Sequence, residues 1–309
     1  MKEPMPRVAV IILSWNRRDE VLKTIALLEH DDYLNKEVIV INNGSIDDTQ
    51  EAVRSRYPTV RVMRLPYNVG CSGFDFGIAN TDADYIVCLD DDSAPDPNAI
   101  SRMVEVFEAN AKVGIVSFNI YGGAYSTEDW EKMEPSDLLG YINCGVGLRP
   151  KAVIDAGFND RDFYLYTNEA DLAIRILNKG YEIVFDPSIR AHHRTSPIGR
   201  SNKRLRTLST RNEAWMVMKY FRLAKIPVMI WRVLFWNANY SRTEGPLSVW
   251  YAFHGLAAAL RHWQKAWKKR QAIRPEILAR YERNYWTFQP ITPWLRRAVR
   301  RRIQALQRA

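Results

Sequence analysis

A short apolar run, Tyr85–Leu89, ends in three consecutive carboxylates, Asp90, Asp91 and Asp92. The run is rich in β-branched and aromatic residues, and this composition predicts a buried strand. Adjacent carboxylates in a cleft repel one another by roughly a few kcal/mol, so they need either solvent or a cation. If the strand continues, Asp90 and Asp92 alternate onto one face, where their oxygen atoms suit Mg²⁺ or Mn²⁺. The alternative is a solvated turn that continues through the serine and prolines that follow.

Strand-like and helix-like patterns alternate through the first half of the chain. Apolar runs predict strands at residues 8–13, 38–41, 60–65, 85–89 and 113–118. Helical spacing and intervening length predict helices at residues 17–29, 47–57, 72–80 and 97–110. Strands separated by helices of this length predict a parallel α/β sheet with helices on both faces. In such sheets, ligands bind at the carboxyl ends of the strands.

Polar, turn-prone loops follow the first three predicted strands. Each leads into the N-terminus of a predicted helix, a position that favours anions and nucleotide groups. The candidate nucleotide-binding residues are Ser14, Asn16 and Arg17 after the first strand, Asn42, Asn43, Ser45 and Asp47 after the second, and Asn68 and Gly70 after the third. Glycine turns into helices are also common connecting features, and that interpretation stays open for each loop taken singly.

The charged residues divide the chain into two halves. Residues 1–189 contain 18 Lys and Arg against 31 Asp and Glu, whereas residues 190–309 contain 26 against 4. This asymmetry favours a catalytic half that carries carboxylates and a basic half that lies on an anionic surface. We therefore expect an α/β domain at residues 1–200 and a basic, Trp-rich helical extension at residues 201–309.

The composition limits the class of protein further. A hydrophobic content of 47% argues against disorder, and the three cysteines have no metal-ligand spacing, so we expect reduced thiols. The first seven residues are too polar for a signal peptide, and no uninterrupted apolar run reaches the length of about 18 residues that a membrane span needs. These features predict a cytoplasmic protein.

Taken in order, the motifs resemble those of glycosyltransferase family 2, the inverting nucleotide-sugar transferases of GT-A fold. The resemblance covers roughly residues 7–196 and is carried by segments 11–17, 38–49, 68–70, 89–92, 141–147, 163–175 and 180–193. It implies a GT-A-type, Rossmann-like, mostly parallel sheet with helices on both faces, followed by a basic α-helical C-terminal extension. Bacterial rhamnosyltransferases and galactofuranosyltransferases are similar members of the family.

The resemblance also implies roles for individual residues. Asp90 and Asp92 correspond to the metal-binding pair, with Asp92 the more direct ligand, and Asp91 lies nearer to the ribose. His193 corresponds to a histidine that completes the metal site, although a structural role for a lone histidine is about as common. Asn42 stands where the family usually has Asp near the nucleobase, and an amide oxygen there could still accept from uracil or thymine.

The segment 168–171 corresponds to the acidic cluster of the family, whose second position supplies the catalytic base. That position is Glu169, and a carboxylate there would accept the proton of the acceptor hydroxyl. Asn168 replaces the usual acidic residue, so we expect the pKa of Glu169 to be raised less than in a dicarboxylate pair. Asp171 is the second candidate for the base, and it could instead pair with Arg175 at i,i+4 spacing.

Beyond Ser196, the chain interleaves eight tryptophans with Arg and Lys, and residues 201–224 predict an amphipathic helix. Aromatic residues beside cationic ones suit an anionic membrane interface. The candidate membrane contacts are Arg261, Lys265, Lys268, Lys269 and Arg270 beside Trp263 and Trp267, and Arg296, Arg297, Arg300, Arg301 and Arg302 beside Trp294. The alternative is a solvated helical domain whose tryptophans form a core. Nucleic acid is not expected as a partner, because no nucleic-acid fold signature accompanies the basic residues.

Together these features predict a divalent-metal-dependent, inverting hexosyltransferase that uses Mg²⁺ or Mn²⁺. We expect a UDP-hexose or dTDP-hexose donor, a lipid-linked or glycan acceptor, and a peripheral location at the inner face of the plasma membrane. Two alternatives remain. A metal-dependent nucleotidyltransferase would also use a carboxylate pair, and a non-catalytic nucleic-acid-binding protein would use the basic half alone.

Overall fold

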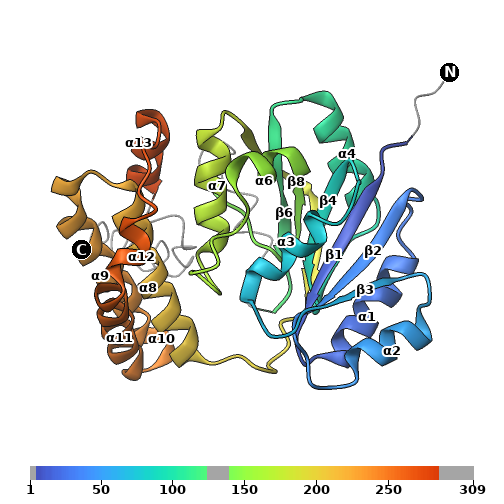
Figure 1. Cartoon of the computed structure of the whole chain (residues 1–309), viewed down its shortest axis with the longest axis horizontal. Coiled ribbons are helices and arrows are strands. Elements are labelled where there is room, and N and C mark those ends of the chain that lie inside the picture. Colours follow the sequence, from blue (N-terminus) through green and yellow to red (C-terminus); the bar gives the residue numbers. More distant parts are fainter. Residues whose placement is uncertain (1–4, 124–138, 285–309) are drawn as a thin grey trace, which may run out of the picture.

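The structure is a computed structural model that describes residues 5–123 and 139–284 (Figure 1). The strands are β1 (Val8–Ser14), β2 (Lys36–Asn42), β3 (Arg61–Arg64), β4 (Tyr85–Asp90), β5 (Ser93–Pro95), β6 (Val113–Tyr121), β7 (Val146–Leu148) and β8 (Glu182–His193). The helices among these strands are α1 (Arg18–Glu29), α2 (Thr49–Arg56), η1 (Gly70–Ser72), α3 (Gly73–Ile78), α4 (Ala99–Ala109), α6 (Pro150–Ala156) and α7 (Asn168–Asn178). Beyond β8 follow α8 (Asn202–Tyr220), η3 (Leu223–Lys225), α9 (Ile226–Asn239), α10 (Ser241–Glu244), α11 (Leu247–Arg261), α12 (Trp263–Trp267) and α13 (Pro275–Asn284).

Within the described residues, the strands form one sheet in the order β3-β2-β1-β4-β7-β6-β8-β5. β1 pairs in parallel with β2 and β4, β2 pairs in parallel with β3, and β6 with β8. β7 and β5 pair antiparallel with their neighbours. The predicted α/β class and the mostly parallel sheet are confirmed. The two short antiparallel strands are additions that the sequence pattern did not predict.

β1 and β4 form the centre of the sheet because their side chains are apolar on both faces. Their β-branched residues favour extended backbone, and neighbours in the strand such as Val10 and Ile11 are fully buried on opposite faces. One core cluster packs α1, α2 and α4 against the sheet, and a second packs α3, α6 and α7. The helices therefore cover both faces of the sheet.

α8 is the central helix of the C-terminal part, which lies to the left of the sheet in Figure 1. α9 and α11 pack on α8 and on each other. Trp215 of α8 and Tyr281 of α13 are nearly fully buried, and their core cluster also contains Phe163 and Ile174 from the α/β part. The helical extension therefore shares a hydrophobic core with the sequence around α7.

The helices beyond β8 begin at Asn202, the first residue of α8. The helix predicted at residues 201–224 corresponds to α8, which ends at Tyr220 because Phe221 has an extended backbone. Residues 194–201 link β8 to α8, and a domain boundary near residue 200 stays a prediction. Trp286, Trp294 and the arginines of residues 296–302 lie outside the described residues. Among the helices that are described, none combines the length and the apolar composition of a membrane span.

Candidate active site

The end of β8 lies beside β5, and this pairing brings His193 to the three consecutive carboxylates. β5 begins directly after Asp92 and pairs antiparallel with β8, so that Ser93 lies opposite His193. His193 Nε2 is 3.1 Å from Asp92 Oδ1, although the two residues are 101 positions apart in the chain. The structure therefore brings two of the three predicted metal ligands into direct contact.

Asp90 completes a possible cation site beside this pair. The ligand atoms of Asp90, Cys144 and His193 all lie within 4.8 Å of one another. Burial raises the pKa of the Cys144 thiol well above its usual value, so the sulfur is protonated and a poor ligand. Burial and the charge of Asp92 also raise the pKa of Asp90, which indicates an excess of negative charge that a cation would relieve. The oxygen and imidazole donors of Asp90, Asp92 and His193 fit Mg²⁺ or Mn²⁺.

Two arginines contact the same carboxylates. Arg17, in the loop between β1 and α1, donates from Nη1 to Asp91 Oδ1 at 3.0 Å and to Asp92 Oδ2 at 3.3 Å. Arg200, in the link between β8 and α8, lies with Nη2 3.4 Å from Asp92 Oδ2. The backbone N–H of Ser196 donates to the same oxygen at 2.7 Å. The sequence pattern predicted Arg17 and missed Arg200 and Ser196, because no motif marks the link.

The neighbouring carboxylates differ in pKa. Burial raises the pKa of Asp91 to about 7, although the charge of Arg17 opposes this shift. Burial alone would also raise the pKa of Asp92, but its hydrogen bond with His193 and the charge of that ring hold the pKa well below its usual range. Asp92 therefore stays ionised, and an ionised carboxylate is the form that binds a divalent cation.

The polar loops after β1, β2 and β3 hydrogen-bond to one another. The backbone N–H of Asn16 donates to Ser45 Oγ at 3.0 Å, which joins the first loop to the second. Asn43 Nδ2 donates to Asn68 Oδ1 at 3.1 Å, which joins the second loop to the third. The structure therefore brings these four predicted nucleotide-binding residues together at one edge of the sheet, and their polar atoms partly hold the loops themselves.

Three further predicted residues lie in these loops or at the strand ends that lead into them. Asn42 Oδ1 accepts from the Ser45 backbone N–H at 2.9 Å, so the oxygen expected to meet a nucleobase already has an internal donor. Asp47 Oδ1 accepts from the Thr49 backbone N–H at 3.3 Å, at the start of α2. Ser14 and Asn42 are almost fully buried. Their part in nucleotide binding stays a prediction.

Glu169 lies in the first turn of α7, close enough to Asp90 for the two charges to interact. Burial raises the pKa of Glu169 to about 7, and the charge of Asp90 adds to the shift. Burial thus produces this shift although residue 168 is Asn168 rather than a second carboxylate. A carboxylate with a pKa near neutrality can accept a proton readily at neutral pH.

Asp171, the second candidate for the base, is fully buried and binds three neighbouring side chains. Asp171 Oδ2 accepts from Arg175 Nε at 3.0 Å and Nη2 at 2.8 Å. Asp171 Oδ1 accepts from the Tyr220 hydroxyl at 2.6 Å and from Lys219 Nζ. Because Lys219 and Tyr220 belong to α8, this buried ion pair joins α7 to the helical extension. The geometry favours the pairing role over the role of base.

The loop before α7 has a backbone that residues with side chains seldom adopt. Tyr164, Tyr166 and Thr167 have φ values of 63°, 65° and 64°. Asn212, on α8 and fully buried, donates from Nδ2 to three carbonyl oxygens of this loop at 3.0, 2.7 and 2.8 Å. The sequence pattern missed Asn212. Its one recognisable feature is that it is a polar residue in a stretch of α8 whose neighbours are mostly buried. Asn212 therefore holds the loop that leads into α7, and Glu169 lies in the first turn of that helix.

Gly70 contacts the same loop from the opposite side. Its φ is 66°, and a Cβ at this position would lie 1.9 Å from the Tyr164 carbonyl oxygen. The backbone N–H of Cys71 donates to that oxygen at 2.8 Å. Only glycine permits this approach, so Gly70 has a structural reason to be there that does not depend on nucleotide binding.

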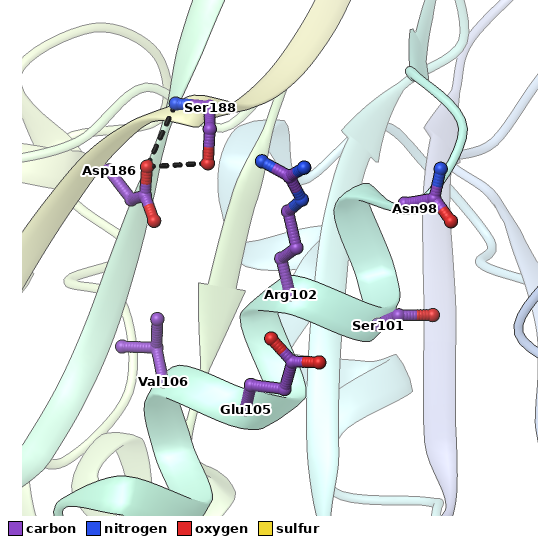
Figure 2. Close-up of a pocket in the computed structure, with 7 residues that line it drawn as sticks. All are labelled: Asn98, Ser101, Arg102, Glu105, Val106, Asp186 and Ser188. Carbon is purple, nitrogen blue, oxygen red and sulfur yellow. Dashed lines mark hydrogen bonds between the residues drawn. The ribbon is translucent and has the colours of Figure 1, made fainter.

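A surface depression between α4 and β8 lies apart from these residues (Figure 2). Arg102 and Glu105 of α4 line one side, and Asp186 and Ser188 of β8 line the other. The Ser188 backbone N–H and hydroxyl donate to Asp186 Oδ1 at 2.8 and 2.7 Å. None of the predicted site residues lines this depression.

The family comparison agrees with this geometry. The model of the family described as Glycosyl transferase family 2 matches residues 9–168. Poly-beta-1,6-N-acetyl-D-glucosamine synthases of Staphylococcus aureus and Staphylococcus epidermidis are each 26% identical over 199 residues, which is 58% of this chain and 48% of theirs. The chain thus spans about half the length of the curated relatives it matches.

Solved structures with the same fold are more distant in sequence. A mannosyltransferase of Pyrobaculum calidifontis in complex with GDP-Man and Mn²⁺ has a TM-score of 0.60 and 16% identity, covering 94% of this chain and 84% of its own. TarS of Staphylococcus aureus has a TM-score of 0.57 and 14% identity, covering 84% of this chain and 80% of the TarS chain. These likenesses bear on the fold alone, and they support the GT-A-type architecture.

The first prediction concerns pH. Because the pKa of Glu169 is raised to about 7, the ionised form that accepts a proton increases as pH rises through 7, and kcat/KM should increase with it. The measurement is kcat/KM from pH 5.5 to 9. The pKa of Asp91 is also raised to about 7, so the rising limb must vanish in Glu169→Gln and persist in Asp91→Asn. If the increase of kcat/KM with pH persists in Glu169→Gln, the titrating group is not Glu169.

The second prediction concerns Asn212. Asn212→Ala removes the amide that donates to three loop carbonyls, and of these the Phe163 oxygen keeps Arg211 as a donor. Glu169 should therefore lose its position and kcat should fall by up to about 10²-fold, with affinity for the nucleotide-sugar nearly unchanged. The matched control is Thr210→Ala on the same helix, because the Thr210 hydroxyl is buried but donates only to its own helix, at Arg206 O. Equal kcat values for the two variants would contradict a positioning role.

Proposed function

Because this chain belongs to glycosyl transferase family 2, we propose that it transfers a hexose from a UDP-sugar or dTDP-sugar to a lipid-linked or glycan acceptor, with inversion at the anomeric carbon. The observation that carries this proposal is the convergence of Asp90, Asp92, His193 and Glu169 at one edge of the sheet. Carboxylates for a cation and a separate carboxylate for a proton are the two requirements of this chemistry.

Asp90, Asp92 and His193 would hold Mg²⁺ or Mn²⁺, which supplies positive charge to the diphosphate of the donor. Arg17 and Arg200 lie against the same carboxylates and bring two further positive charges to that edge. Their guanidinium groups suit phosphate oxygens, so we infer that they help to bind the diphosphate once the donor is present.

Glu169 would accept the proton of the acceptor hydroxyl while that oxygen forms a bond to the anomeric carbon. In the same step, the bond between the anomeric carbon and the diphosphate oxygen breaks, and the nucleoside diphosphate leaves with the bonding electron pair. A single displacement of this kind inverts the anomeric configuration. The pKa of Glu169, raised to about 7 by burial, suits a base that works near neutral pH.

The relatives support a role in cell-surface glycan synthesis. Two of the named proteins are poly-beta-1,6-N-acetyl-D-glucosamine synthases, and the structural neighbours include complexes with GDP-Man and Mn²⁺ and with UDP. We accordingly propose a divalent cation, a nucleotide-sugar donor, and a cytoplasmic site of action at the inner face of the plasma membrane. A panel of nucleotide sugars, tested for Mn²⁺-dependent hydrolysis and thermal stabilisation, tests the donor class directly.

The third prediction concerns the metal ligands. Asp92→Ala, or the more conservative Asp92→Asn, should weaken Mn²⁺-dependent binding of the nucleoside diphosphate by at least about tenfold, because Asp92 supplies the ionised oxygen of the site. His193→Ala should cause a milder loss, since water can replace one ligand. Isothermal titration with and without Mn²⁺ measures both. Asp186→Asn, on β8 but in the depression of Figure 2, is the control, and an unchanged affinity in both Asp92 variants would exclude this metal site.

The fourth prediction concerns the base. Glu169→Gln keeps the size of the side chain but cannot accept the proton, so turnover should fall by about 10² to 10⁴ with donor affinity nearly unchanged. Asp171→Asn should instead destabilise the fold by roughly 3–5 kcal/mol, because it breaks a buried ion pair. NMR of the product should show inversion. A stable Asp171→Asn protein that lacks turnover, together with an active Glu169→Gln protein, would exchange the two assignments.

A further inference from the structure

The outer sides of η3, α9, α11 and α12 expose large apolar side chains, and we call this surface the aromatic face. Trp231 is 65% exposed and Trp250 is 60% exposed, although both lie in regular helices. The other members are Leu223, Val228 and Phe235 on η3 and α9, Leu247, Phe253 and Leu260 on α11, and Trp263 and Trp267 on α12. Because α9 and α11 pack on each other and on α8, their exposed sides adjoin at the flank of the molecule remote from the sheet (Figure 1).

The packing of α11 is the reverse of that of a helix that faces water. Its buried positions hold small residues, Ser248, Ala252, Gly255 and Ala259. Most of its large apolar residues are exposed, namely Leu247, Trp250, Phe253 and Leu260, whereas Leu256 packs against the core. Gly255 lies so close to α8 that a Cβ there would lie 2.5 Å from the Thr207 carbonyl oxygen. A helix with one solvent-exposed side normally buries its large apolar residues and exposes polar ones. This arrangement indicates that the outer side of α11 has an apolar neighbour.

The charges around the aromatic face are almost all positive. Residues 222–270 contain nine Lys and Arg but one acidic residue, Glu244. Three of the nine, Lys225, Lys265 and Lys269, pair with acidic residues outside this range. Glu244 is paired with Arg206 at 2.9 Å, so its charge is neutralised within the helical part. Arg222, Arg242 and Arg261 are exposed around the face. An apolar surface with a cationic rim matches the interface of a bilayer that contains anionic lipid.

The structure also changes which basic residues can meet such a surface. Lys265 and Lys269 were expected as membrane contacts, but they form ion pairs with Asp162 at 2.8 and 2.7 Å. They therefore fasten α12 to the α/β part. The second expected cluster, at residues 296–302, lies outside the described residues. Arg261, from the first expected cluster, remains exposed beside the apolar sides of α9 and α11.

We propose that the aromatic face lies in the interfacial layer of an anionic lipid bilayer, with α9 and α11 parallel to the membrane plane. α9 has 14 residues and α11 has 15, so each is about 21 to 23 Å long, shorter than the hydrocarbon core of about 30 Å. A second copy of this chain is a poorer occupant, because two such faces would bring like charges together. This inference deepens the proposed function, since a lipid-linked acceptor would be presented at the same surface.

The link between the two sites is short. Residues 194–201 connect the carboxylate edge to α8, and Arg206 near the start of α8 contacts Glu244 of α10 beside the aromatic face. Docking of the face would therefore bring the bilayer to the helical part that this link joins to the carboxylate edge.

The fifth prediction tests the surface by flotation of the full-length protein with vesicles of phosphatidylcholine alone or with 30% phosphatidylglycerol. We expect binding to the anionic vesicles that weakens as salt rises, and at most weak binding to the neutral ones. Trp231→Ser with Phe235→Ser, and separately Trp250→Ser with Phe253→Ser, should each lower the partition coefficient at least about tenfold. Tryptophan fluorescence with brominated lipid should show quenching in the wild type that is reduced in both double variants.

Two controls separate this surface from general effects. Leu34→Ser removes an apolar side chain that is 84% exposed on the α/β part and should leave binding unchanged. Arg242→Gln with Arg261→Gln should reduce binding to anionic vesicles. Lys23→Gln, which removes the charge of an exposed lysine on α1, should not. Mn²⁺-dependent donor hydrolysis in solution should be the same in all of these variants, so failure of the surface and failure of the proposed activity give different results.

Two results would overturn the proposal. Equal flotation of the wild type and both double variants would show that the aromatic face does not contact lipid. A concentration-dependent dimer, detected by light scattering and abolished by the same substitutions, would assign the face to a second copy of the chain. Binding that requires anionic lipid and is reduced in both double variants supports the proposal.

Discussion

The arrangement of this protein depends on how it neutralises carboxylates that are buried together. Asp92 is fully buried, and it is contacted by a histidine from β8, an arginine from the β1–α1 loop and an arginine from the link to α8. A buried charge without partners is costly, so these three segments must come together for the sheet edge to be stable. The antiparallel pairing of β5 with the end of β8 follows the same requirement, because it is this pairing that brings His193 to Asp92.

A second buried carboxylate joins the two halves of the chain. Asp171 lies two residues after Glu169, and its partners Lys219 and Tyr220 come from the helical extension. Asn212, also on α8, holds the left-handed loop on the other side of Glu169. The extension therefore contributes the framework that positions the proposed base, besides any contact with a membrane. Deleting it would expose a buried ion pair and release a strained loop, so the α/β part is not expected to keep a working site alone.

Local periodicity predicted the central strands, the helices between them and the edge at which the polar residues gather. β1 and β4 are apolar on both faces, and this pattern is typical of strands in a parallel sheet that helices cover on both sides. The short strands β5 and β7 have three residues each, too few for a periodic signal. Arg200 and Asn212 acquire their roles through contacts with residues far away in sequence. The ion pair of Lys265 could not be predicted for the same reason, because its partner Asp162 lies 103 positions away.

The replacement of a family carboxylate by Asn168 has a physical consequence at the site. Glu169 keeps a pKa near 7 because burial and the charge of Asp90 raise it, and neither cause requires an acid at position 168. Since Asp90 is also a candidate metal ligand, a cation at this edge would offset the charge that helps to raise the pKa of Glu169. Glu169 would then be more fully ionised when the metal and donor are bound than in the empty site. In this arrangement, proton acceptance by Glu169 would depend on donor binding through Asp90, whereas a second carboxylate at position 168 would keep the pKa of Glu169 high in both states.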